Sequence, residues 1–395
     1  MNFQRAAFSA QHLWSSPFVR WQGRLADVSS LDVAVALTRD ALAQRRCELH
    51  RIDQLVLGTT VPQPRSFYAV PWMAARLGMS GISGPHVAQA CATSVACVVA
   101  AALQVETRAA SRALVVTADR TSNGPLLAYP RPRAMGGSPA IENWVLDNFA
   151  SDPNTAQSMV HTAEAVAREG GMSRQALDDL TLLRHEQYKT ALADDRRIQR
   201  GYLQPVVIEQ GRSRLVVDQD EGVHDTSADG LRALKPVHED GVVTFGSQTH
   251  PADGAAGTLV LPHDDARTLA DGHGVVRLVS AAFARAEKAR MPKAATTAAL
   301  RALDFAGLSM ADVHAVTTHN PFAVNDLWFA QQTGWALERM NPYGCSLVYG
   351  HPQGPTGLRA IAELVQALKA RGGGVGLFTG CAAGDTGAAL VLRLE

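Results

Sequence analysis

The chain has 395 residues and carries 37 Lys and Arg against 37 Asp and Glu, so its formal net charge is zero. This balance argues against a nucleic-acid-binding or membrane-surface protein. The length allows two or three domains with large cores, and we see neither a signal peptide nor a run of about 18 apolar residues. The five cysteines form no C-x-x-C pair, which argues against a zinc knuckle or a disulfide framework and favours a reducing cytoplasm.

The first third of the chain predicts alternating helices and strands. Apolar residues at helical spacing favour an amphipathic helix over 30–46, and a second helix is expected over 68–77. Short apolar runs predict strands over 52–57 and 113–118. This alternation is typical of an α/β layered domain.

The stretch 86–107 lies between these elements, and the rest of the chain is organised around it. It begins as a short strand, turns at Cys91 and continues from Ser94 as a helix that is apolar nearly all round. Cys91 is therefore expected just before a helix N-terminus, where free N–H groups and the helix dipole would make its thiol acidic. Taken alone, Cys91 is equally well explained as a packing residue, and Cys97 on the helix body is better explained that way.

The composition of the chain changes in its middle part. Residues 121–153 are rich in Pro, Gly, Asn and Ser and are expected to be irregular. The elements expected after them are helices over 159–168 and 173–195, a strand over 204–209 and a buried strand over 253–261. We interpret 121–251 as an inserted domain. It interrupts a first half formed by 1–120 and completed by about 252–273, and residues 274–395 form the second half.

The last third of the chain, like the first, predicts alternating strands and helices. Its expected elements are strands over 274–280, 313–318, 375–379 and 388–394, with helices over 294–306, from 323 through 333, and over 358–368. In both halves, strands end at loops marked by Gly or Pro that carry a reactive side chain. These side chains are Cys91, His319, His351 and Cys381. Each has an ordinary interpretation alone, but in open α/β sheets such loops carry the site.

Four loops resemble those of the thiolase family. Residues 350–357 (GHPQGPTG) are similar to its G-H-P-x-G-x-[ST]-G loop, and Cys91-Ala92-Thr93 stands at its C-x-S nucleophile loop. Residues 319–322 (HNPF) stand at its N-E-A-F loop, in the His-first variant of sterol-carrier-type thiolases. Residues 380–384 (GCAAG) stand at its C-x-G loop.

The inserted region carries the resemblance too. Residues 159–164 (MVHTAE) are similar to the family's M-G-x-T-A-E, and residues 253–256 (DGAA) to its N-D-G-A-A. The resemblance covers about residue 30 to the end. It implies an α/β fold of two similar βαβαβαββ halves in a layered arrangement. Each half would hold a mixed five-stranded sheet, and an inserted loop domain would cover coenzyme A. It also implies a homodimer or homotetramer.

The resemblance implies a role for each loop. Cys91 would be acylated by a (β-keto)acyl-CoA and pass the acyl group to coenzyme A, or to the enolate of a second acyl-CoA. His351 would take the Cys91 proton, and Cys381 would protonate the leaving enolate or remove an α-proton. His319 would help hold one oxyanion, and the N–H groups of Cys91 and Ala383 the other.

The resemblance also implies how substrate is bound. Met159, Met291 and Phe322 stand at pocket-wall positions, and Thr249 stands where a serine of the family contacts pantetheine. Coenzyme A and acyl-CoA are expected as substrates, with no permanently bound cofactor and no metal. The basic residues of the inserted region that could hold the coenzyme A phosphates are Arg131, Arg133, Arg196, Arg197, Arg212 and Arg232.

Several positions depart from the family pattern. Ala383 replaces the glycine of C-x-G, and Asn320 and Pro321 are unusual inside their loop. The family's M-G-x-G-P is here 291–295 (MPKAA), and its G-G-x-E-S-M-S is 117–123 (TADRTSN). These changes flank the expected acyl pocket and dimer contact, so they favour a non-standard substrate over an inactive protein.

Two alternatives remain. A β-ketoacyl-synthase-like enzyme that decarboxylates a malonyl thioester would use a cysteine with two histidines, but it would not need Cys381. A non-catalytic acyl-CoA-binding or scaffold protein could share the fold, but the four intact catalytic side chains argue against it.

Overall fold

The computed structural model describes residues 1–395 apart from the side chain of Gln210. Its centre is an eleven-stranded sheet in which nine strands follow the order β13-β14-β15-β12-β1-β11-β6-β4-β5, and β2 and β3 pair with β11. The strands are β1 (Ala6–Ser9), β2 (Leu13–Ser15), β3 (Val19–Arg20), β4 (Gln54–Gly58), β5 (His86–Val87), β6 (Ala113–Arg120), β11 (Ala252–Pro262), β12 (Val275–Arg285), β13 (Ala315–His319), β14 (Gly374–Ala382) and β15 (Thr386–Leu394).

The strand pairing repeats itself in the two halves. In the first, β4 is parallel to β6, while β6–β11 and β11–β1 are antiparallel. In the second, β13 is parallel to β14, while β14–β15 and β15–β12 are antiparallel. The prediction of two similar halves is therefore confirmed. The second half has four strands plus a single bridge from Met340 to Val316 rather than five strands, and β1–β12 pairing joins both halves into one sheet.

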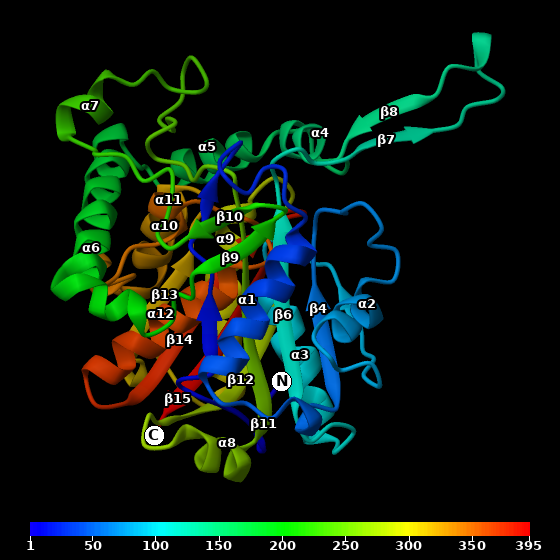
Figure 1. Ribbon diagram of the computed structural model, residues 1–395. Helices are drawn as coiled ribbons and strands as arrows, with labels where there is room; N and C mark the ends of the chain where they lie inside the picture. Colours follow the sequence, from blue (N-terminus) through cyan, green and yellow to red (C-terminus); the bar gives the residue numbers. More distant parts are fainter.

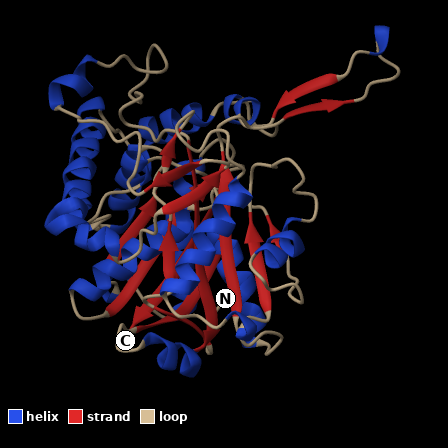
Figure 2. Cartoon of the chain, viewed as in Figure 1, coloured by secondary structure: helices blue, strands red, loops and turns tan.

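Helices cover both faces of this sheet (Figures 1 and 2). They are α1 (Ser30–Gln44), α2 (Ala69–Arg76), α3 (Thr93–Glu106), α8 (His263–Ala270), α9 (Met291–Ala306), α10 (Ala323–Thr333), α11 (Ser346–Tyr349) and α12 (Thr356–Ala370). Short 3-10 helices are η1 (Leu49–Arg51), η2 (Met135–Gly137), η3 (Met310–Asp312) and η4 (Leu337–Arg339). None of the described helices is long and apolar enough to cross a membrane.

Helices α3 and α12 form the central layer. They contact each other, and one buried cluster joins Val98 of α3 and Leu364 of α12 to Val115 and Leu390 from the two halves of the sheet. Helices α1 and α8 pack on the other face of the first half, and α9 packs on that of the second. Because α3 is apolar nearly all round, it can be enclosed between two layers. The layered arrangement predicted from the sequence is thus confirmed.

Residues 121–251 contain more regular structure than expected. They form β7 (Leu126–Tyr129), β8 (Ala140–Asn143), α4 (Leu146–Ala150), α5 (Met159–Glu169), α6 (Arg174–Arg200), β9 (Val206–Gln210), β10 (Ser213–Val217) and α7 (Ala228–Ala233). The prediction of an irregular stretch over 121–153 is wrong, because β7 and β8 pair as a hairpin. This hairpin projects from the body of the molecule (Figure 1), so no buried face imposes a hydrophobic pattern on its sequence.

Candidate active site

Cys91 and His351 meet at the centre of the molecule. Each stands shortly before one of the two central helices, Cys91 before α3 and His351 before α12. The Nε2 atom of His351 lies 3.1 Å from Sγ of Cys91, and its Nδ1 atom lies 2.6 Å from Oγ1 of Thr356. When Nδ1 of His351 carries the ring hydrogen and donates it to Oγ1 of Thr356, the lone pair of Nε2 faces the thiol of Cys91. This is the geometry of a nucleophile beside an oriented base.

The thiol of Cys91 is not acidic at rest, so the prediction from its place near a helix N-terminus is wrong. Burial raises its pKa to about 12, and the N–H groups of Ala383 and Cys91 oppose this shift. Desolvation of a thiolate outweighs these few donors. Cys91 therefore rests as a neutral thiol, and its proton must pass to a base as the sulfur attacks.

His319 lies beside this pair at the end of β13. Its ring stacks on that of His351 with centroids 4.1 Å apart, and its Nδ1 lies 3.1 Å from Oγ of Ser346. Its buried Nε2 has no hydrogen-bond partner among the described residues. Burial lowers the pKa of His319 to about 3, so the ring is neutral near pH 7. A neutral imidazole with a free nitrogen is suited to donate to a developing oxyanion.

One atom each from Cys91, His319 and His351 lie within 4.8 Å of one another, close enough to share a metal ion. A thiol and two imidazoles are ligands that zinc accepts. A metal there would occupy the sulfur nucleophile. The contact that the structure shows between Cys91 and His351 is a hydrogen bond, which serves acyl transfer directly.

A buried network holds the loop of His319. The Asp326 carboxylate accepts hydrogen bonds from Nδ2 of Asn320 and Oγ1 of Thr318, both at 2.7 Å. It also pairs with Arg184 of α6 at 2.8 Å, and neither side chain of that pair is more than 1% exposed. The unusual Asn320 therefore has a structural explanation, because it binds the loop to this buried carboxylate.

Cys381 lies at the end of β14 and is buried. Nδ2 of Asn325 lies 3.1 Å from its Sγ and donates to it. Burial raises the pKa of Cys381, and the neighbouring Cys91 raises it further. Cys381 is therefore a neutral thiol with a proton to give, and the structure brings all four predicted side chains together.

Asp119 fixes the GHPQG loop against the first half. Its carboxylate accepts N–H groups from Thr60, Val61 and Gly354 at distances between 2.7 and 2.9 Å. A Cβ atom at Gly354 would lie 2.8 Å from Oδ2 of Asp119, so this approach requires a glycine. Burial raises the pKa of Asp119 to about 7, against the effect of these donors.

A cavity of about 240 Å³ opens onto Cys91 and His351. The structure places the predicted Met159, Thr249, Met291, Phe322 and Ala383 in its wall. Pro321, which the sequence analysis placed beside the expected pocket, lines it too. The lining residues that the sequence analysis missed are Phe149, Val160, Gln248, Pro251 and Gln353. Most of them lie within a few residues of Thr249, Phe322, His351 or Met159 in the sequence, and this closeness could have indicated them. Phe149 gave no signal, because it lies within the stretch 121–153 that was interpreted as irregular.

A second cavity of about 560 Å³ shares Gln248, Thr249 and Pro251 with the first. Histidines and Phe245 contribute to its wall, and α7 supplies Gly230 and Leu231. The six arginines considered from the sequence line neither cavity, although Arg232 lies on α7. The two cavities therefore adjoin at these shared residues, and the first of them reaches Cys91.

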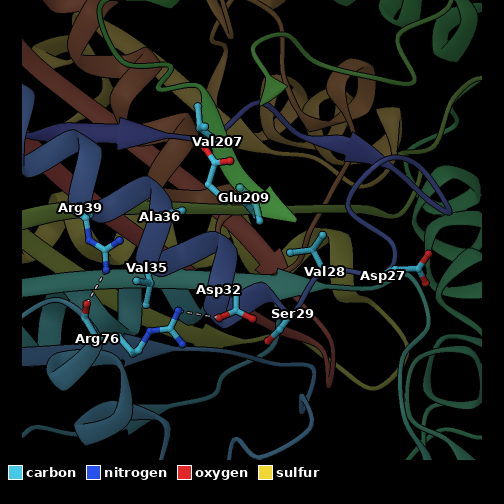
Figure 3. A pocket seen from close by; sticks show the side chains of 11 residues that line it. Asp27, Val28, Ser29, Asp32, Val35, Ala36, Arg39, Arg76, Val207 and Glu209 are labelled. Carbon is cyan, nitrogen blue, oxygen red and sulfur yellow. Dashed lines mark hydrogen bonds and ion pairs between the residues drawn. The ribbon is translucent and has the colours of Figure 1, made fainter. Parts of the chain in front are cut away.

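Another cavity, of about 520 Å³, lies beside α1 and is lined by charged side chains (Figure 3). Arg76 pairs with Asp32 at 3.5 Å, and Arg39 donates to the carbonyl of Arg76 at 2.7 Å. These arginines already have partners, and none of the residues lining the cavity is a cysteine or histidine. It is therefore separate from the chemistry at Cys91.

Comparison with known proteins identifies the family of the chain. Residues 14–264 match the family model for the thiolase N-terminal domain, and residues 273–394 match that for the C-terminal domain. An acetyl-CoA acetyltransferase of Escherichia coli strain K12 is 26% identical over 94% of this chain and 95% of its own length. A 3-ketoacyl-CoA thiolase of Bacillus subtilis strain 168 is 28% identical over 94% of this chain and 95% of its own length.

Solved structures are similar over the whole chain. The crystal structure of the Bacillus anthracis acetyl-CoA acetyltransferase has a TM-score of 0.91 at 22% identity, with 100% of both chains covered. Human mitochondrial 3-ketoacyl-CoA thiolase in complex with CoA has a TM-score of 0.90 at 22% identity, with 100% of this chain and 99% of that chain covered. The predicted fold and the predicted acyltransferase activity, by thiolysis or condensation, are confirmed, and the chain belongs to the thiolase family.

Proposed function

We propose that Cys91 is the nucleophile and His351 the base of this acyltransferase. The observation that carries the proposal is the 3.1 Å contact between Sγ of Cys91 and Nε2 of His351. As the sulfur attacks a carbonyl carbon of the β-ketoacyl thioester, its proton passes to His351. The pair is neutral before the reaction, so no ion pair has to persist in the buried site.

Cys381 then supplies the proton that the breaking carbon–carbon bond requires. The electron pair of that bond remains on the departing enolate, which takes the proton from the Cys381 thiol. Asn325 donates to the resulting thiolate from 3.1 Å. In the reverse direction, the thiolate removes an α-proton from a second acyl-CoA, which gives the condensation.

Two donor sets stabilise the oxyanions. The N–H groups of Cys91 and Ala383, which already face the sulfur, hold one. His319 holds the other through Nε2–H, provided that Ser346 donates its hydroxyl hydrogen to Nδ1. Each such donor is worth about 3–4 kcal/mol. This assigns to His319 the role of the first residue of the family's N-E-A-F loop, as in sterol-carrier-type thiolases.

Coenzyme A and acyl-CoA are the proposed substrates, with no permanently bound cofactor or metal. The acyl group would occupy the cavity at Cys91, and the pantetheine arm would pass Thr249 into the outer cavity. The related human thiolase solved in complex with CoA supports this assignment. Residues 121–251 would be the inserted coenzyme A-binding region, with 1–120 and 252–273 as the first half and 274–395 as the second.

We further propose a homodimer or homotetramer in the cytoplasm. The projecting hairpin β7–β8 supports self-association, because Leu126 is 67% exposed, Met135 fully exposed and Ile141 61% exposed. Apolar side chains gathered on such an arm favour burial against another molecule. Light scattering would measure the mass of the assembly, and a monomer would contradict this part of the proposal.

Thiolysis of β-ketoacyl-CoAs of increasing chain length tests the function directly. We expect turnover by the parent protein and none by Cys91→Ala. A decarboxylating enzyme would instead act on malonyl thioesters and keep that activity in Cys381→Ala. A binding or scaffold protein would retain ligand without acylation of Cys91.

A further inference from the structure

Besides His351, a second polar side chain touches the reacting sulfur. Oε1 of Gln353 lies 3.3 Å from Sγ of Cys91, on the loop that also carries His351. Gln353 is only 6% exposed and lines the cavity at Cys91. It occupies the position that the G-H-P-x-G pattern leaves open, so the pattern alone assigns it no role.

The backbone of Gln353 is held in place from both sides. Its φ is +61°, a left-handed conformation that costs about 1 kcal/mol for a residue other than glycine. Its carbonyl accepts the N–H of Thr356 at 3.2 Å, and the following Gly354 donates to Asp119 at 2.9 Å. This fixed loop therefore holds the carboxamide of Gln353 next to the sulfur of Cys91.

The neutral thiol has one hydrogen and two acceptors. It can donate to Nε2 of His351 at 3.1 Å or to Oε1 of Gln353 at 3.3 Å. Once the proton has moved to His351, a carbonyl oxygen next to the thiolate would be repelled. Rotation of the carboxamide about its Cγ–Cδ bond exchanges oxygen and nitrogen, and Nε2 of Gln353 has no other hydrogen-bond partner among the described residues.

We propose that Gln353 is a further catalytic residue, which donates Nε2–H to the thiolate of Cys91. This inference rests on the proposed role of Cys91 as nucleophile. The S–H bond breaks, the proton goes to His351, and the electron pair stays on sulfur until it forms the bond to the acyl carbon. The carboxamide gives up no proton itself.

The Nε2–H donor of Gln353 stabilises the sulfur of Cys91 only in certain states of the reaction. A thiolate is a strong hydrogen-bond acceptor and a thioester sulfur is a weak one, so Nε2–H stabilises sulfur only while it carries charge. This occurs when Cys91 attacks and again when it leaves during transfer to coenzyme A. Interactions made only in the charged states raise kcat rather than lower KM.

Alkylation by iodoacetamide tests the proposal, because only the thiolate reacts and Cys91 can be identified by peptide mass. We expect Gln353→Leu to lower the alkylation rate roughly tenfold between pH 7 and 9, equivalent to about one unit in the pKa of Cys91. The kcat of acyl transfer should fall by a similar factor with little change in KM. Gln175→Leu, at an exposed position of α6 that lines neither cavity, is the matched control and should alkylate at the parent rate.

Gln353→Glu separates charge from shape. It keeps the size of the side chain but replaces the donor by a carboxylate, so we expect it to alkylate more slowly than Gln353→Leu. A role in packing alone predicts the opposite order, with the glutamate variant close to the parent, and this result would overturn the inference. Parent rates in both variants would overturn it too. If no acyl-CoA acylates the parent protein, the proposed function fails, while the order of alkylation rates still decides the role of Gln353.

Discussion

His351 and Cys91 come from opposite halves of the chain, yet Nε2 and Sγ lie 3.1 Å apart. The two residues precede α12 and α3, the helices that pack against each other between the two halves of the sheet. Each half thus contributes one member of the pair through an equivalent connection. The geometry of the base and the nucleophile depends on the contact between the two halves.

The first prediction concerns the base itself. His351→Ala should slow acylation of Cys91 by a factor on the order of 10²–10⁴, the usual range for loss of a general base. Thr356→Val removes only the partner of Nδ1 and should slow it about tenfold, because the ring loses its orientation rather than its function. Rapid-quench measurement of acyl-enzyme formation checks both rates. An unchanged rate in His351→Ala would contradict the assignment.

Cys381 should be needed for one half of the chemistry only. Exchange of an acyl group between two coenzyme A molecules through Cys91 forms no carbanion. We expect Cys381→Ala to keep this exchange, whereas cleavage of β-ketoacyl-CoA falls by a factor on the order of 10²–10⁴. Isotope exchange into acetyl-CoA, measured beside thiolysis, separates the two reactions. Equal losses in both would contradict the role given to Cys381.

Stability should fall in acid because of His319. Burial lowers its pKa to about 3, whereas an unfolded chain protonates histidine near about 6.5. As the pH falls below about 6.5 the unfolded state takes up the proton first, so stability is lost down toward the folded pKa, by up to about 1.4 kcal/mol per pH unit. His319→Asn should therefore show a smaller drop in Tm between pH 7 and 5. His50→Asn, at an exposed position, serves as the control and should follow the parent protein.

Asp119 should matter for both folding and activity. Asp119→Asn places an amide group where the carboxylate now accepts three backbone N–H groups and the Thr60 hydroxyl. We expect the free energy of unfolding to fall by about 2–3 kcal/mol and turnover to fall as the Gly354 loop shifts. Denaturant titration and thiolysis assays measure the two effects. Parent-like stability would show that Asp119 does not anchor this loop.

The acyl-transfer activity could be predicted from the sequence, because each proposed catalytic side chain lies in a loop with its own local pattern. The buried helix after Cys91 and the strand ending at His319 were likewise visible in short apolar runs. The strands before residue 20 and the β7–β8 hairpin were not, since their pairing partners are distant in the chain or their faces are exposed.

Two features of the site required the three-dimensional structure. The pKa of Cys91 depends on burial by residues from both halves, which no local pattern records. The position of Gln353 beside the sulfur depends on a left-handed backbone held by the network around Asp119 and Thr356. Long-range packing sets the pKa of Cys91, and a strained local backbone sets the position of Gln353.

The most direct test of the account is the intact mass of the protein after mixing with acetoacetyl-CoA and longer β-ketoacyl-CoAs, without free coenzyme A. We predict an added acyl mass that maps to Cys91, disappears when coenzyme A is supplied and is absent from Cys91→Ala. The absence of any adduct across the series, or an adduct on another residue, would contradict the central claim that Cys91 carries the acyl group.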